Sequence, residues 1–215
     1  NRCRRQRQMC IRDRCPTIEE YDSYAQDHPT WGMPYGMPNL SSNEYSTLMS
    51  WLQNGAIMNA PIPLTLEQQA LVEEYEQFFN NGSRKAQLTA RYIYEHLFLS
   101  HLYFSELNET TPRFFTLVRS ETPPGQPVKR IATRRPYDDP NVDRVYYRFV
   151  PEQATIVDKT HMPFALNSQR INNWKAWFID TTYDVAQLPG YEPEVAANPM
   201  TAFIELPVKS RFKFM

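Results

Sequence analysis

Residues 88–104 read LTARYIYEHLFLSHLYF, a run that is nearly apolar on all sides. A helix that is apolar around its whole circumference is buried at the centre of a domain. We therefore predict a long central helix from Ser83 to Phe104. On such a helix His96 and His101 would stand about 140° apart, which is too far for a zinc-binding pair. Both histidines are interpreted as buried or hydrogen-bonded structural residues.

Two shorter helices are predicted before this one, and each is marked by a capping box. Ser41 with Glu44 begins the first helix, which carries an apolar stripe and ends at Gly55. Thr65 with Gln68 begins the second helix, which ends near residue 81. A proline-containing linker is expected between the two helices.

The pattern changes after residue 113 to short β-branched and aromatic runs bounded by proline and glycine turns. Helix is predicted again at 167–178, and Asn198 with Pro199 begins a short one. The predicted fold class is α+β, mainly helical with a small antiparallel sheet. Strands are predicted at 113–120, 128–134, 144–150, 155–160 and 207–214.

The first fifteen residues hold all three cysteines and six arginines, but they match no metal site. Their C-x6-C-x4-C spacing fits no zinc site, and the c-type haem signature C-x-x-C-H is absent. Residues 9–14, MCIRDR, back-translate to a transposon end sequence that is used to prepare DNA for sequencing. We therefore expect residues 1–14 to be an artefact of sequence assembly, joined to a truncated gene, and exclude them from the fold.

Charge and composition exclude several classes of protein. Without residues 1–14 the chain has 17 basic and 23 acidic residues, a net charge of −6, against 23 and 24 in the whole sequence. Nucleic acid is therefore not expected as a partner. No run of 18 apolar residues is present, so no transmembrane helix is expected. The absence of a glycine-rich phosphate loop and of a G-x-S-x-G turn argues against a nucleotide cofactor and a serine hydrolase.

Residues 31–56, WGMPYGMPNLSSNEYSTLMSWLQNGA, resemble the C-terminal part of a c-type cytochrome domain. In such a domain a methionine on an extended loop provides a thioether ligand to the haem iron, and the last helix packs beside the porphyrin. Met33 is the first candidate for this ligand and Met37 the second. The alternative interpretation is that both methionines fill gaps in the packing.

The segment 117–149 concentrates arginines whose planar guanidinium groups suit phosphate. An alternative interpretation is a structural network of ion pairs with the nearby aspartates. His161, close to Lys159, is a candidate acid, base or metal ligand, or a hydrogen-bonded structural residue. The arginines are Arg119, Arg130, Arg134, Arg135 and Arg144, and the aspartates are Asp138, Asp139, Asp143 and Asp158.

Several long strings between Cys15 and Met215 resemble the bacterial fatty acid cis/trans isomerase family. They include RYIYEHLFLSHLYFSEL, LVRSETPPGQPVKRIATRRPYDDP and YEPEVAANPMTAFIELPVKSRFKFM. The resemblance implies a periplasmic enzyme with covalently bound haem c that converts cis double bonds in membrane phospholipid acyl chains to trans under membrane stress. It also implies that 15–60 is the remnant of a cytochrome c-like haem domain and 61–215 an α+β isomerase-family domain.

The resemblance further implies a mechanism in which haem iron transiently weakens the double bond, so that no nicotinamide or ATP is needed. Because the C-x-x-C-H motif is missing, we expect this fragment to be inactive alone. We expect peripheral contact with the membrane and an apolar channel along residues 92–104. A competing interpretation is a cytochrome-related electron-transfer or interaction protein without isomerase activity. From their charge alone, the candidates for binding the phospholipid head group are Arg134, Arg135, Lys159 and His161.

Overall fold

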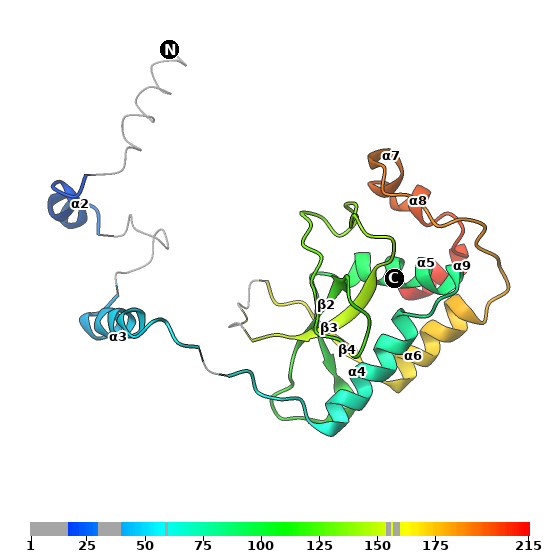
Figure 1. The fold of residues 1–215 in the computed structure, drawn as a ribbon, viewed down its shortest axis with the longest axis horizontal. Coiled ribbons are helices and arrows are strands. Elements are labelled where there is room, and N and C mark those ends of the chain that lie inside the picture. The colour runs from blue at the N-terminus through cyan, green and yellow to red at the C-terminus, as the bar shows by residue number, and fades with distance from the viewer. Residues whose placement is uncertain (1–16, 30–39, 59, 154–155, 157–159) are drawn as a thin grey trace, which may run out of the picture. The chain divides into compact units, whose positions relative to one another are not determined.

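The structure is a computed structural model that describes residues 17–29, 40–58, 60–153, 156 and 160–215 (Figure 1). The chain divides into two compact units, residues 1–60 and 61–215, and each is described by itself. Within the described residues, no helix combines the length and the apolar character needed to cross a membrane.

The described residues of the first unit form the helices α2 (Tyr21–Asp27) and α3 (Ser42–Gln53). The predicted capping box of α3 is confirmed, because the Ser41 hydroxyl accepts from the Glu44 backbone N–H and the Glu44 carboxylate accepts from the Ser41 backbone N–H. The apolar stripe of α3 is largely exposed. Since Met33 and Met37 lie outside the described residues, the resemblance to a piece of cytochrome c stays a prediction.

The second unit begins with two helices, α4 (Leu66–Phe79) and α5 (Arg84–Leu97). The predicted capping box of Thr65 and Gln68 starts α4, with both of its reciprocal hydrogen bonds present. The two helices contact each other, and α5 is mostly buried, as its apolar sequence predicted.

The prediction that the helix beginning at Ser83, now α5, continues to Phe104 is wrong. The helix ends at Leu97, and residues His101–Phe104 form strand β1. In this strand Leu102 and Phe104 are buried, and their neighbours are half-buried. The His101 backbone N–H donates to the Met162 carbonyl at 2.9 Å, which starts the pairing with a strand about sixty residues away. An apolar run without periodicity cannot distinguish a buried helix from a buried strand, and this long-range pairing decides between them.

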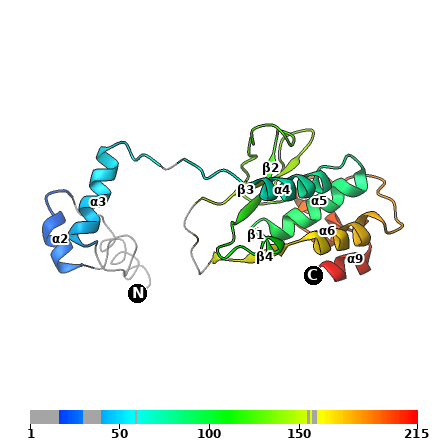
Figure 2. The same cartoon turned by 90° about the horizontal axis from the view of Figure 1, so that it is seen from below.

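Among the described residues the sheet has four strands, in the order β3-β2-β1-β4 (Figure 2). Strands β2 (Phe115–Ser120) and β3 (Tyr146–Pro151) were both predicted as strands, and they pair antiparallel with Leu117 opposite Phe149. Strand β4 (Pro163–Leu166) was not predicted and runs parallel to β1. The sheet is therefore mixed, and the prediction of an antiparallel sheet is wrong in this respect. Parallel strands need a long connection, and the segment between β1 and β4 provides one.

Of two other predicted strands, one differs from the structure and the other is not tested by it. Segment 128–134 forms a single bridge, between Arg130 and Ser120. Most of 155–160 lies outside the described residues. A short helical turn, η1 (Ser105–Leu107), follows β1.

The segment after β4 contains helices joined by loops. The predicted helix 167–178 is present as α6 (Ser168–Trp174), which continues in the wider turn η3 (Lys175–Ile179). Two short helices follow, α7 (Pro193–Ala196) and α8 (Pro199–Ala202), and the Asn198 side chain caps the second of them as predicted. The last segment is a helix, α9 (Val208–Phe214), so the predicted strand at 207–214 is wrong.

An aromatic core joins these elements. Tyr75 on α4 lies edge-on to the rings of Phe149 on β3 and Trp174 on α6. Its hydroxyl donates to the Asn167 carbonyl at 2.9 Å and accepts from the Asn167 N–H at 3.1 Å, so the start of α6 is tied to α4. The long segment between β2 and β3, residues 121–145, takes little part in this core and lies mostly at the surface.

Candidate functional site

Four arginines line one cavity of about 380 Å³ in the second unit. Arg119 comes from β2, and the others come from the loop between β2 and β3. Tyr94 and Phe98, at the end of α5, form part of the wall, and Glu152 also lines the cavity. The loop arginines are Arg130, Arg134 and Arg135.

Arg119 is a buried residue of this cavity and bonds to the loop that lines it. Its side chain is 2 % exposed, yet it forms no ion pair with a described carboxylate. It donates to two neutral acceptors, the Asp138 carbonyl at 2.8 Å and the Thr133 hydroxyl at 2.5 Å. Its Nε is buried and finds no hydrogen-bond partner within the described part of the chain. A buried cation with an unused donor is costly unless an anion binds nearby.

The loop folds around Arg119 through its own hydrogen bonds. The Ile131 N–H donates to the Arg119 carbonyl at 2.9 Å, and the Thr133 hydroxyl donates to the Arg135 carbonyl at 2.8 Å. The Asp138 carboxylate accepts from the Arg135 backbone N–H at 2.9 Å. These bonds leave the side chains of Arg134 and Arg135 exposed at the mouth of the cavity.

The described residues do not contain the structural ion-pair network of the alternative interpretation. Among the described residues, no ion pair joins the arginines of segment 117–149 that were proposed to bind phosphate to Asp138, Asp139 or Asp143. Asp158 lies outside the described residues. Arg144 donates instead to the Asn80 carbonyl at 2.9 Å.

A second cavity, of about 410 Å³, lies next to the first. Arg134, Arg135, Pro136 and Phe98 line both, so the two arginines stand between them. The far wall is formed by helix ends, with Pro199 and Phe203 on one side and Glu95 and His96 on the other.

Glu95 is the acidic group of the second cavity. Burial raises the pKa of its carboxyl, while the hydrogen bond from Arg91 Nε, at 2.8 Å, opposes the shift. Because this carboxylate is already bonded to Arg91, it does not neutralise Arg134 or Arg135 through an ion pair. The paired cavities therefore present a cationic side and an aromatic side.

The other predicted site residues lie elsewhere. Lys159, Met33 and Met37 are outside the described residues. His161 does not line either cavity: its Nδ1 lies 2.9 Å from Nδ1 of His101, and its ring lies edge-on to Phe114. The histidine partner was missed because the prediction placed His101 on a helix rather than on β1.

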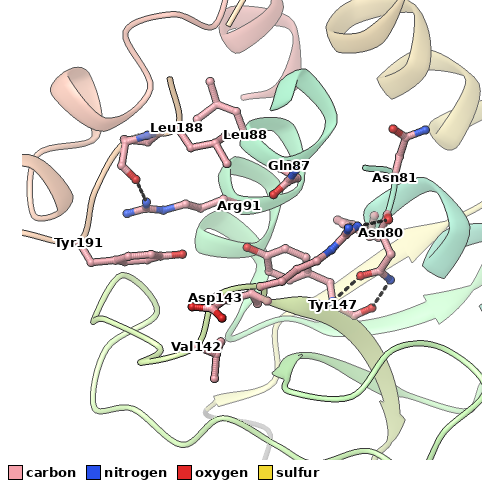
Figure 3. Close-up of a pocket in the computed structure, with 14 residues that line it drawn as sticks. Asn80, Asn81, Gln87, Leu88, Arg91, Val142, Asp143, Tyr147, Leu188 and Tyr191 are labelled. Carbon is pink, nitrogen blue, oxygen red and sulfur yellow. Dashed lines mark hydrogen bonds between the residues drawn. The ribbon is translucent and has the colours of Figure 1, made fainter. Parts of the chain in front are cut away.

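Figure 3 shows a smaller cavity, of about 120 Å³, that the sequence did not indicate. Arg91 lies at its edge with the guanidinium 4.1 Å from the centre of the Tyr191 ring, and donates to the Pro189 carbonyl at 2.9 Å. Its Nη2 is buried and has no partner in the described residues. Burial raises the pKa of Tyr147, on the opposite wall, well above its usual value. The sequence feature that could have indicated this cavity is Arg91, a charged residue within the apolar run 88–104.

The predicted channel along residues 92–104 is filled by side chains. Tyr92 packs against Phe178, Phe203 and Phe214, and Ile93 and Leu97 are buried in the core. Of this segment, Tyr94 and Phe98 line the first cavity, and Glu95, His96 and Phe98 line the second.

The described residues do not form a haem site. All the cysteines and both candidate methionines lie outside them. In the part that is described, no group of three or more metal-binding side chains occurs. The two facing nitrogens of His101 and His161 are 2.9 Å apart, a hydrogen-bond distance that leaves no room for an iron ion on the line between them.

Comparison with known proteins gives one clear match. The model of the family described as fatty acid cis/trans isomerase matches residues 4–215. No curated protein and no solved structure matches the chain.

Proposed function

Because the chain belongs to the fatty acid cis/trans isomerase family, whose enzymes act on unsaturated phospholipid acyl chains, we propose that the arginine cavity binds the phospholipid phosphate. Arg119, Arg130, Arg134 and Arg135 would hold the head group there while the acyl chain is isomerised. The family match favours this enzyme over the electron-transfer alternative.

The observation that carries the proposal is the excess of positive charge in the cavity, where four arginines face the single carboxylate of Glu152. Four guanidinium groups line it, none of them ion-paired among described residues, and Arg119 retains a buried unpartnered N–H. Guanidinium forks match the oxygen geometry of phosphate and form charge-assisted hydrogen bonds with it. A phosphate oxygen accepting from Arg119 Nε would supply the partner that the fold does not.

The size of the cavity supports head-group binding rather than enclosure of a whole lipid. A volume of about 380 Å³ lies at the lower end of the range of roughly 300–1,000 Å³ for drug-sized ligands. It accommodates a phosphate with its glycerol, and the acyl chains would extend from its mouth. The aromatic wall of the neighbouring cavity offers apolar contact to the first part of a chain.

We propose that the groups that isomerise the double bond lie outside the described residues. The family resemblance implies a haem, but the described residues do not fit one. The finer proposals therefore rest on the resemblance: that Met33 or Met37 ligates haem c, that haem iron weakens the double bond, that the protein is periplasmic, and that this chain alone is inactive.

Binding of a monomeric short-chain phosphatidylglycerol, measured by calorimetry, tests the proposal. The double variant Arg134→Gln, Arg135→Gln removes two exposed cations and should bind at least tenfold more weakly. The control variant Arg84→Gln, Arg144→Gln removes the same charge away from the cavity and should change the affinity less than twofold. Equal loss in both variants, or no binding by the unmodified chain, would disprove the head-group site.

The enzymatic part is tested separately in cells that carry the gene. Analysis of their phospholipids should find more trans-unsaturated acyl chains than in cells without it. The double variant should lower that yield more than the control variant does. Unchanged trans content in cells with the intact gene would contradict isomerase activity for this protein.

A further inference from the structure

The C-terminal segment carries an apolar surface that the core does not use. Four large apolar side chains of α8, α9 and the turn between them are each more than 70 % exposed. We call this surface the α8–α9 face. Its residues are Met200 (73 % exposed), Ile204 (71 %), Val208 (72 %) and Phe212 (82 %).

The geometry of α9 separates an inner side from an outer side. At 100° per residue, Val208 and Phe212 lie within about 40° of each other, while Ser210 and Phe214 lie on the opposite side of the helix. Ser210 is buried and donates to the Trp177 carbonyl at 2.5 Å, and Phe214 packs on Trp174 and Phe178. The helix is thus anchored to η3 through its inner side, and it lies next to α6 in Figure 2. The apolar side chains of its outer side are exposed.

Met200 extends this outer side onto α8. Its sulfur lies 3.9 Å from Nη1 of Arg211, so the exposed methionine of α8 lies beside α9. Ile204 lies on the connecting turn between the two helices. Exposed apolar side chains gathered in this way mark an interaction surface rather than the scattered apolar residues of an ordinary surface.

The charges around the face identify its partner. Between Met200 and Met215 the sequence has three basic side chains, Lys209, Arg211 and Lys213, against one acidic side chain, the half-buried Glu205. On α9, Lys209 and Arg211 lie on either side of the line through Val208 and Phe212, at about 100° and −60° from Val208. An apolar stripe flanked by cations is the pattern of helices that lie in the interface of an anionic bilayer.

We propose that the α8–α9 face docks on an anionic phospholipid bilayer, with Val208 and Phe212 inserted at the level of the head groups. This inference rests on the proposed function, because an enzyme whose substrate is a membrane lipid must reach the bilayer. It adds the surface through which this chain makes that contact. The cations beside the face would pair with lipid phosphates, and the arginine cavity is a separate site that receives one lipid.

Cosedimentation of the full 215-residue chain with vesicles tests the docking surface. Vesicles of equal parts phosphatidylglycerol and phosphatidylcholine should bind it, and pure phosphatidylcholine vesicles should bind it at least fivefold more weakly. The variant Val208→Ser, Phe212→Ser should lose at least tenfold in affinity for the mixed vesicles. The control Leu66→Ser, Leu99→Ser removes two equally exposed apolar residues elsewhere and should lose less than twofold.

Several outcomes would overturn the proposal. One is that the unmodified chain does not bind the mixed vesicles; another is that the docking and control variants bind equally. A third is that the unmodified chain is a dimer in solution and the docking variant a monomer, which would make the face a contact between copies. Since all four substituted positions are exposed, circular dichroism should confirm an unchanged fold.

The same samples separate this inference from the proposed function. The docking variant should bind monomeric short-chain phosphatidylglycerol as tightly as the unmodified chain does, because the arginine cavity is intact. Loss of vesicle binding with retained monomer binding supports the docking face. Loss of both in the docking variant would contradict the assignment of two separate sites.

Discussion

Glu76 on α4 is the side chain on which we expect the second unit to depend most strongly for its stability. It is 4 % exposed, and its Oε2 accepts from Nε of Arg148 at 2.9 Å. Its Oε1 accepts from the Phe149 backbone N–H, also at 2.9 Å. Arg148 in turn donates to the Pro123 carbonyl at 2.7 Å and to the Gln126 carbonyl at 3.0 Å. One carboxylate therefore connects α4, β3 and the loop that follows β2.

The substitution Glu76→Gln keeps the shape and removes the charge. The amide oxygen can still accept from Phe149, but the amide nitrogen faces a guanidinium donor. A hydrogen bond to a charged group contributes about 1.5–3 kcal/mol, and leaving one partner of a buried pair alone costs about 3–5 kcal/mol. Because one bond is kept, we expect the free energy of unfolding to fall by about 3 kcal/mol.

Urea unfolding followed by tryptophan fluorescence measures this loss, since Trp174 is only 1 % exposed in the core. The control is Glu74→Gln on the same helix, whose 3.8 Å contact with Lys175 joins two side chains that are about 40 % exposed. An exposed pair contributes at most about 1 kcal/mol, so the control should change little. A Glu76→Gln loss below about 1 kcal/mol, or equal to the control, would refute the reasoning. Replacing both partners, with Glu76→Leu and Arg148→Met, should recover much of the loss.

Three further predictions use the same unfolding assay. Thr65→Ala removes the hydroxyl that caps α4 and should cost about 1 kcal/mol; an unchanged urea midpoint would contradict the cap. Ser210→Ala removes the bond to the Trp177 carbonyl and should cost about 0.5–1.5 kcal/mol; no change would mean that α9 is held by apolar contacts alone. Burial raises the pKa of five tyrosines above its usual value, so the folded state favours their neutral form. The free energy of unfolding should therefore be constant up to about pH 10 and fall at higher pH, by up to about 1.4 kcal/mol per pH unit for each tyrosine. Urea midpoints that stay constant above pH 10 would contradict this linkage. These residues are Tyr75, Tyr92, Tyr94, Tyr147 and Tyr183.

The helix starts could be predicted because their signals are local. Ser41 and Thr65 each bond to a residue three positions along the chain, so the pattern contains both partners. The arginine cavity was partly predictable for a different reason. Arg134 and Arg135 were candidates from residue type alone, while the burial of Arg119 and its unpartnered Nε depend on how the loop folds over β2.

The final segment illustrates where local pattern fails. In a strand, Phe212 and Phe214 would share a face, and their alternation with charged residues suggested a strand. In the structure they lie on opposite sides of α9, with Phe214 against the core aromatics and Phe212 82 % exposed. The buried surface offered by Trp174 and Phe178 selects the helix, and neither residue is near it in sequence.

The sequence by itself determined the α+β class, the capped helices α3 and α4, the strands β2 and β3, and the resemblance that the family match confirms. Only the tertiary structure decided that residues 101–104 form a strand, that β4 joins it in parallel, and that His101 meets His161. The physical reason is the range of the interactions. Capping and periodicity act within one or two turns of the chain, whereas strand pairing and burial are settled by partners about sixty residues away.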